Sequence, residues 1–176
     1  MRFNCFSEST VVRYSLAMEK SVSPLLTRCV TVVVGQGAAH AAPDRLTIGR
    51  TGTDAAIVKV PARNDTLAVG NRLRGAVYTW SKGDPPCDPT GSTVYAGHAW
   101  RAGNGVADRW GSLRRGDVIK VAGCRFKVTG REYWPASRRM GSLYSVAGPA
   151  RIVLVGCKAD DYSRRTVVFA RKIGRS

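Results

Sequence analysis

The sequence predicts an all-β domain, because short strand-like segments and turn signals alternate along most of its length. From about Asp44 onward, segments rich in Val, Ile, Thr and aromatic residues are separated by Gly, Pro, Asp and Asn clusters. No segment has the longer apolar periodicity of an amphipathic helix. The chain has 176 residues and is 44% hydrophobic, which suits one domain with a real core. Eight closely spaced segments favour a closed or nearly closed barrel, or a sandwich.

The expected strands follow one another with few long connections. Turn signals separate them at 50–54, 82–86, 101–105 and 114–117. We expect only one helical turn with clear support, at 106–113, before the Arg-Gly-Asp turn. The eight expected strands cover residues 46–48, 55–60, 76–80, 92–99, 117–123, 125–134, 150–157 and 165–172.

The first 42 residues are typical of a leader rather than of the folded domain, which we place at 43–176. A short apolar stretch precedes small residues with an A-x-A arrangement at Ala39–Ala41, as in a secretory signal peptide. Met18 is an alternative start. The stretch is too short for a convincing membrane span, so an exported protein is the main hypothesis, with a poor membrane anchor or a disordered leader as alternatives.

The formal net charge of +16 is large, and the basic residues are scattered through the chain rather than gathered in a tail. This distribution predicts a folded domain with a positive face. Nucleic acid, anionic lipid and acidic wall polymer are all partners that such a charge allows.

Three cysteines, Cys87, Cys124 and Cys157, lie in the predicted domain. In an oxidising compartment two of them can pair, and Cys87 with Cys124 is the candidate disulfide. Cys157 ends the expected strand 150–157, where a buried cysteine acting as a small hydrophobe is one interpretation. The other is a nucleophile, since Lys158 favours the thiolate and a polar loop follows.

His98 and two arginines also stand at strand ends. His98 opens a Gly-rich loop, where a scaffold can present a reactive group, although a satisfied structural imidazole is the alternative. The short loop 158–163 lets strands 150–157 and 165–172 pair antiparallel, which brings Arg164 and Arg165 towards Cys157. Alternation puts Arg165 on the face of Phe169, which we expect to be interior. Arg165 is therefore the candidate oxyanion donor and Arg164 the runner-up, with plain surface charge as the alternative.

Together these residues predict nucleophilic acyl transfer: a thiolate of Cys157 attacks a peptide carbonyl, a thioester forms, and His98 protonates the leaving amine.

The sequence resembles the sortases, the cysteine transpeptidases of Gram-positive cell surfaces. The resemblance rests on GHAWR around His98, WGSLRRGDVIKV after it, and VLVGC followed by RRTVVFA. It runs from about Leu46 to Lys172. VLVGC keeps only Leu154 and Cys157 of the family motif TLxTC. The Ala-, Arg-, Gly- and Val-rich composition suggests an actinobacterium or its phage as the source. The resemblance implies a member similar to class D, E or F.

The resemblance implies a closed eight-stranded β-barrel with one or two short helices. It implies an enzyme that cleaves an LPxTG-like sorting signal of a surface protein and transfers the acyl group to an amine of a peptidoglycan precursor or a pilin. On this pattern Cys157 is the nucleophile, His98 the general acid and base, and Arg165 the arginine. We expect no cofactor and no metal, since Asp160–Asp161, Asp84 and Asp88 fit turns, with bound calcium as the alternative. We expect no nucleic acid, because no strand is rich in Phe and Tyr on which bases could stack. The resemblance also implies a membrane-proximal monomer outside the cell.

Two rivals belong to other classes. An L,D-transpeptidase needs a histidine close before its cysteine, whereas His98 lies far upstream of Cys157. A catalytically degenerate sortase-fold protein, or a basic β-barrel that binds wall polymer or peptide without turnover, is the non-enzymatic alternative.

Overall fold

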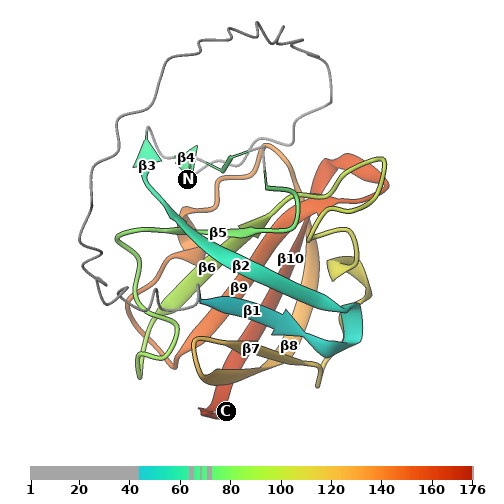
Figure 1. The fold of residues 1–176 in the computed structure, drawn as a ribbon. Coiled ribbons are helices and arrows are strands. Elements are labelled where there is room, and N and C mark those ends of the chain that lie inside the picture. Colours follow the sequence, from blue (N-terminus) through green and yellow to red (C-terminus); the bar gives the residue numbers. More distant parts are fainter. Residues whose placement is uncertain (1–43, 64–65, 68, 71–72, 176) are drawn as a thin grey trace, which may run out of the picture. The chain divides into compact units, whose positions relative to one another are not determined.

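The computed structural model describes residues 44–63, 66–67, 69–70 and 73–175, with strands as the dominant element. The predicted leader and Met18 lie outside these residues. Ten strands are described (Figure 1): β1 Arg45–Ile48, β2 Thr53–Val60, β3 Ala62–Arg63, β4 Thr66–Leu67, β5 Val77–Trp80, β6 Ser92–Gly97, β7 Val118–Val121, β8 Cys124–Pro135, β9 Arg151–Lys158 and β10 Asp161–Arg175.

Eight of the described strands close into a barrel in the order β1-β2-β5-β6-β9-β10-β8-β7, and β3 and β4 form a separate hairpin. Each of the eight predicted segments contributes one barrel strand, so the predicted closed eight-stranded barrel is confirmed. The pairs β2–β5 and β6–β9 are parallel, and the other neighbours are antiparallel. Parallel pairing needs long crossover connections, and these carry the segments around the site.

Local sequence explains the turn between β7 and β8. Ala122 and Gly123 connect β7 to β8, and both have positive φ angles of 49° and 74°. A two-residue hairpin loop of this kind matches the right-handed twist of the strands it joins.

Helical structure in the described chain is limited to three single 3-10 turns, one more than the upper expectation: η1 Gly49–Thr51, η2 Trp110–Ser112 and η3 Gly141–Leu143. The turn η2 lies inside the segment 106–113, where the sequence predicted a helical turn. The additional turns are too short to leave an apolar periodicity in the sequence.

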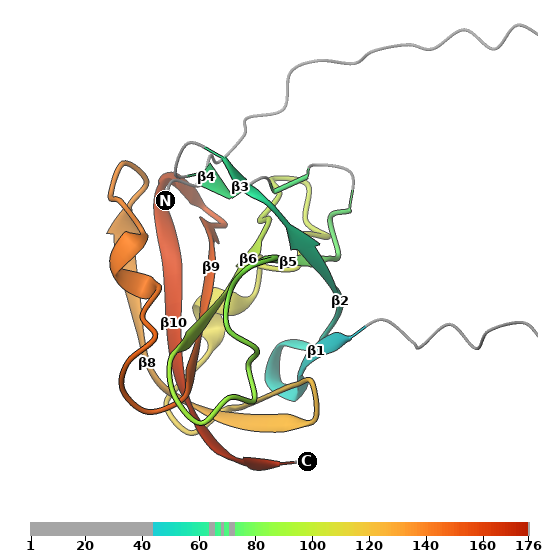
Figure 2. The same ribbon diagram turned by 90° about the vertical axis from the view of Figure 1, so that its left-hand side faces the viewer.

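The sheet has apolar side chains on both faces, and this corrects one prediction. The barrel interior holds Leu154, Val168 and Ala170. The opposite face of the same strands holds Val167 with Phe169 packed nearby, in a second cluster with Met140 of the β8–β9 segment. The face of Phe169 is therefore the outer face, not the interior. Figure 2 shows the β8–β9 segment on the outer side of β8 and β10.

A disulfide joins Cys87, in the loop between β5 and β6, to Cys124 at the start of β8, with Cα atoms 5.9 Å apart. Lys172 Nζ of β10 donates to the Cys87 carbonyl, so the same loop is also held to the last strand.

Removing this disulfide should lower the free energy of unfolding by about 2–4 kcal/mol, because the bond closes a 37-residue separation in the unfolded chain. The variant Cys87→Ser with Cys124→Ala tests this in urea denaturation. An unchanged urea midpoint would contradict the expectation.

No helix among the described residues is long and apolar enough to cross a membrane.

Candidate active site on the outer face of the barrel

Three strand ends meet at one edge of the outer face, and strand register places the predicted site residues in one row. Cys157 of β9 is paired with Arg165 of β10. Gly97, the last residue of β6, is paired with Gly156, so His98 follows at the level of Cys157. Neighbouring strands lie about 4.8 Å apart, so the three residues occupy adjacent positions across the sheet.

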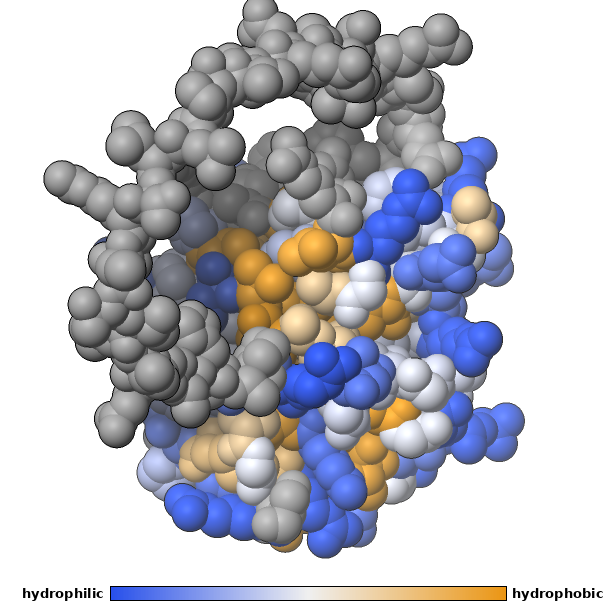
Figure 3. All heavy atoms as spheres, in the orientation of Figure 1, coloured by the Kyte–Doolittle hydropathy of each residue, from blue (hydrophilic) through white to orange (hydrophobic). Residues whose placement is uncertain are grey.

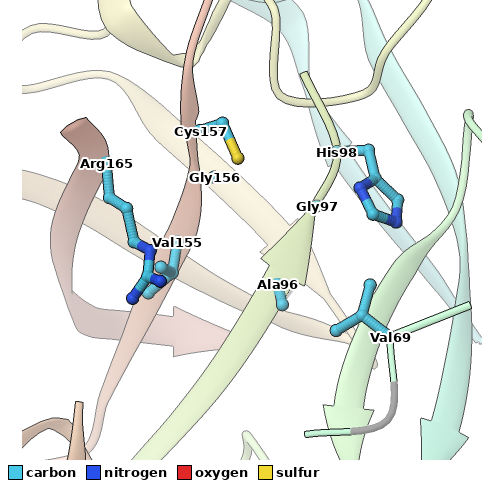
Figure 4. A pocket seen from close by; sticks show the side chains of 8 residues that line it. All are labelled: Val69, Ala96, Gly97, His98, Val155, Gly156, Cys157 and Arg165. Carbon is cyan, nitrogen blue, oxygen red and sulfur yellow. The ribbon is translucent and has the colours of Figure 1, made fainter. Parts of the chain in front are cut away.

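A pocket opens over this row, and His98, Cys157 and Arg165 all line it. The other lining residues include Ala96 and Val155, which are one step further down the strands, and Val69 from the segment after β4. In Figure 4, Cys157 lies between Arg165 and His98, and the guanidinium of Arg165 extends beside Val155. The three predicted residues are nearly buried, with 8% of His98, 8% of Cys157 and 3% of Arg165 exposed.

The runner-up arginine lies elsewhere. Arg164 is exposed, and its Nη2 donates to the backbone carbonyl of Tyr133 at 3.5 Å. It does not line the pocket. The structure therefore separates the two arginines, and it brings only Arg165 to the row with Cys157.

His98 is oriented by its surroundings. Its Nε2 lies 2.9 Å from the Gly70 carbonyl. Because a carbonyl only accepts, Nε2 carries the proton in this bond, and Nδ1 is the nitrogen left to give or take a proton. The rings of Tyr78 and Trp100 flank the imidazole at centroid distances of 6.1 and 5.5 Å.

Arg165 sits in a dry environment. Burial lowers the pKa of its guanidinium from its ordinary value to about 10. A poorly hydrated cation at this point interacts strongly with negative charge that develops near Cys157.

Several solved structures that are similar in shape to this chain are sortases. Sortase C-1 from Actinomyces oris matches with a TM-score of 0.61 and 19% identity over 74% of this chain and 73% of that one. Sortase A from Listeria monocytogenes matches with a TM-score of 0.60 and 16% identity over 78% and 92%. The sortase D5 transpeptidase from Clostridium perfringens matches with a TM-score of 0.58 and 19% identity over 75% and 79%.

The chain has the sortase fold. No protein-family profile and no curated protein matches it by sequence. The similar structures carry class letters A, C and D, so the class of this sortase-fold chain stays a prediction.

In this sortase-fold chain the loop after His98 is held by a carboxylate that the sequence analysis did not single out. Asp108 accepts from the backbone N–H of Trp100 through Oδ1 and from that of Gly105 through Oδ2, both at 2.8 Å. The N–H of Ala107 donates to the His98 carbonyl at 2.9 Å. The spacing of Asp108 from a Gly-rich loop was a usable signal, since Asp commonly bonds nearby backbone amides.

Replacing Asp108 with alanine should lower kcat/KM for the acyl transfer predicted from the sequence by about tenfold to 100-fold. The reason is that the loop that begins at His98 loses both hydrogen bonds and the imidazole moves. Hydrogen exchange at the Trp100 and Gly105 amides should rise in parallel. Asp117→Ala is the matched control, since Asp117 bonds the Arg114 amide at 2.7 Å in another loop. Equal losses in both variants would contradict a positioning role for Asp108.

Gly97 and Gly156, behind the row, leave space for residues 106–110, which follow the loop that begins at His98. A Cβ on Gly97 would lie 2.6 Å from Val106 Cγ1 and 2.7 Å from the Trp110 ring, and a Cβ on Gly156 would lie 2.4 Å from Ala107 Cβ. Trp110 is completely buried. Glycine at position 156, where the sortase motif has threonine, therefore seats the 106–110 segment under the row.

Among the described residues, no group of three or more His, Cys, Asp or Glu side chains is arranged to hold a metal ion.

Proposed function

We propose that this chain is a sortase-type cysteine transpeptidase. The observation that carries the proposal is the single row formed by His98, Cys157 and Arg165 across the outer face of β6, β9 and β10. A nucleophile, a proton carrier and a buried cation at adjacent positions are the groups that acyl transfer through a thioester requires.

In the proposed reaction, the Cys157 thiolate attacks the carbonyl carbon of the scissile peptide bond. The tetrahedral intermediate collapses, the C–N bond breaks, and the His98 imidazolium gives its proton to the leaving amine. An acceptor amine then attacks the thioester, His98 takes a proton from it, and Cys157 leaves as the thiolate. Arg165 stabilises the negative charge on the substrate oxygen in both steps.

The substrate class follows from the resemblance and the fold. We infer a surface protein with an LPxTG-like C-terminal sorting signal, and an acceptor amine on a peptidoglycan precursor or a pilin. The enzyme would then act outside the cell, close to the membrane. Val69, Ala96 and Val155 give the pocket an apolar floor beside the row, which suits the apolar side chains of such a signal.

Acyl-enzyme formation tests the proposal. The full chain is incubated with LPxTG- and LAxTG-type peptides, with and without reductant, and intact mass is measured before an amine is added. We expect an adduct that Cys157→Ala abolishes, and a ligated product once the amine is present. Peptide binding without an adduct for any peptide would instead support the degenerate, non-catalytic alternative.

Arg165 should set an alkaline limit near pH 10 on its own contribution to kcat/KM, because it loses its charge as the pH rises through its lowered pKa of about 10. The charged form is the one that stabilises the oxyanion, so the contribution of Arg165 is retained below this pH and lost above it. In Arg165→Lys the limit should move to lower pH, since an ordinary lysine pKa of about 10.4 is lowered by the same burial. The measurement is kcat/KM against pH for the wild type and Arg165→Lys, with circular dichroism as a folding control. Identical pH profiles for the two proteins would contradict the role proposed for Arg165.

A further inference from the structure

The outer surface of the barrel carries a line of basic side chains far from the pocket. The line crosses β9 and β10 near the ends of these strands that lie away from the pocket. These residues lie on β7, β8, β10 and β9, and we call them the basic stripe: Lys120, Arg125, Lys127, Arg171 and Arg151. The first four are exposed and Arg151 is half-buried. Figure 3 shows hydrophilic side chains along the lower edge of the visible face, where Figure 1 places β7.

Strand register puts these cations directly opposite one another. Lys120 of β7 is paired with Arg125 of β8. Lys127 of β8 is paired with Arg171 of β10, and Arg171 is paired on its other side with Arg151 of β9. Cations therefore recur about every 5–7 Å along an oblique path over four strands, by the ordinary strand spacing and two-residue repeat.

This arrangement costs stability, because like charges in directly opposite positions of a sheet repel. Within the described part of the chain, the carboxylates that form ion pairs are Asp54, Asp117 and Asp160, and their partners all lie outside the stripe. Neither folding nor neutralisation by these carboxylates explains the pairing of the cations. A bound external anion would offset the repulsion.

The neighbours of the stripe show which kind of anion fits. On the side of the stripe that faces the pocket, the outward positions are neutral: Val118 on β7, Thr129 on β8 and Phe169 on β10. The cations thus have a neutral border on the side of the pocket, which suits a linear polyanion better than a membrane plane. The exposed large apolar residues described are Leu73, Val146 and Ile173. None of them is aromatic. Phe169, the aromatic ring beside the stripe, is half-buried and packs against the Trp134 ring at a centroid distance of 6.3 Å, so it is not a free platform for a base.

We propose that the basic stripe binds a linear polymer that carries phosphate groups and no aromatic rings, of the kind found in a cell envelope. Three of the five side chains are arginines, whose planar guanidinium bonds phosphate in a bidentate way. Arg151 and Cys157 lie six residues apart on β9, so the stripe is about 20 Å from the nucleophile and leaves the pocket open. The choice of an envelope polymer rests on the proposed extracellular function, whereas the binding chemistry does not.

Binding of long-chain inorganic polyphosphate to the full chain tests this. The stripe variant carries Lys120→Gln, Arg125→Gln, Lys127→Gln and Arg171→Gln. The matched control carries Lys59→Gln, Lys82→Gln, Arg109→Gln and Arg115→Gln, four exposed positions outside the stripe with the same loss of charge. Both sets are also made with Cys157→Ala, so binding is measured independently of turnover.

We expect polyphosphate to bind the wild type and the control, and the stripe variant to lose most of the salt dependence. The slope of log affinity against log salt should fall by about three, since each phosphate contact contributes roughly 0.7–0.9. The stripe variant should also melt at a higher temperature without ligand, because the opposed cations are gone.

Three results would overturn the proposal. One is equal loss of binding in the stripe and control variants. Another is tighter stripe-dependent binding of a single-stranded oligonucleotide of the same charge, which would favour nucleic acid. The last is stripe-dependent binding to phosphatidylglycerol vesicles in place of polyphosphate, which would favour a membrane. Peptide turnover by the stripe variant should equal that of the wild type, and this keeps the proposed function separately testable.

Discussion

Replacing Arg165 with alanine should lower kcat/KM for a sorting-signal peptide by about 100- to 1,000-fold, because the proposed mechanism loses its buried donor to the oxyanion. Arg165 is 3% exposed and is paired in register with Cys157. Loss of the guanidinium leaves no other arginine among the residues that line the pocket. The loss should fall mainly on kcat, since the charge on the substrate oxygen develops only in the transition state.

Arg164→Ala is the matched control for this variant. It removes the same side chain from the adjacent position, where Arg164 is exposed and bonds the Tyr133 carbonyl. We expect kcat/KM within about twofold of the wild type, as for most surface substitutions remote from the chemistry. If Arg164→Ala is inactive and Arg165→Ala is active, the assignment of the arginine is wrong.

The strands were predictable because their pattern is local. Alternating β-branched and aromatic residues between Gly and Pro turns marked all eight barrel strands, and the short loop 158–163 predicted that β9 and β10 pair antiparallel. Which face is interior was not predictable from Phe169. Val167 and Val168 are both completely buried, because the β8–β9 segment covers the outer face, so alternation in β10 carries no sign of inside or outside.

The candidate site residues stood out in the sequence, but their arrangement in space did not. His98 and Cys157 stood out as polar side chains at strand ends. Their position in one row depends on the parallel pairing of β6 with β9, two strands far apart in sequence, and such register is not encoded locally. The hydrogen bonds of Asp108 and the packing of Trp110 against the glycines were also not predicted. Both depend on a loop that folds back under the row.

Restoring the threonine of the sortase motif at position 156 should destabilise this chain rather than improve it. In Gly156→Thr the new Cβ would lie 2.4 Å from Ala107 Cβ, 3.2 Å from the Gly97 carbonyl oxygen and 3.3 Å from the Trp110 ring. Ala107 and Trp110 are buried and cannot move into solvent. We expect the free energy of unfolding to fall by about 3 kcal/mol, the upper end for overpacking, with loss of acyl-enzyme formation as the row is displaced.

Urea denaturation measures this loss, and two further variants identify its cause. Gly130→Thr in β8 is the matched control, because a Cβ there meets nothing within 4 Å, and we expect no loss of stability. The double variant Gly156→Thr with Ala107→Gly removes the nearest clashing atom and should recover part of the stability. If Gly156→Thr is as stable as the wild type, the glycine is not required by the packing of Ala107 and Trp110. The departure from the family motif would then have to be explained by the substrate instead.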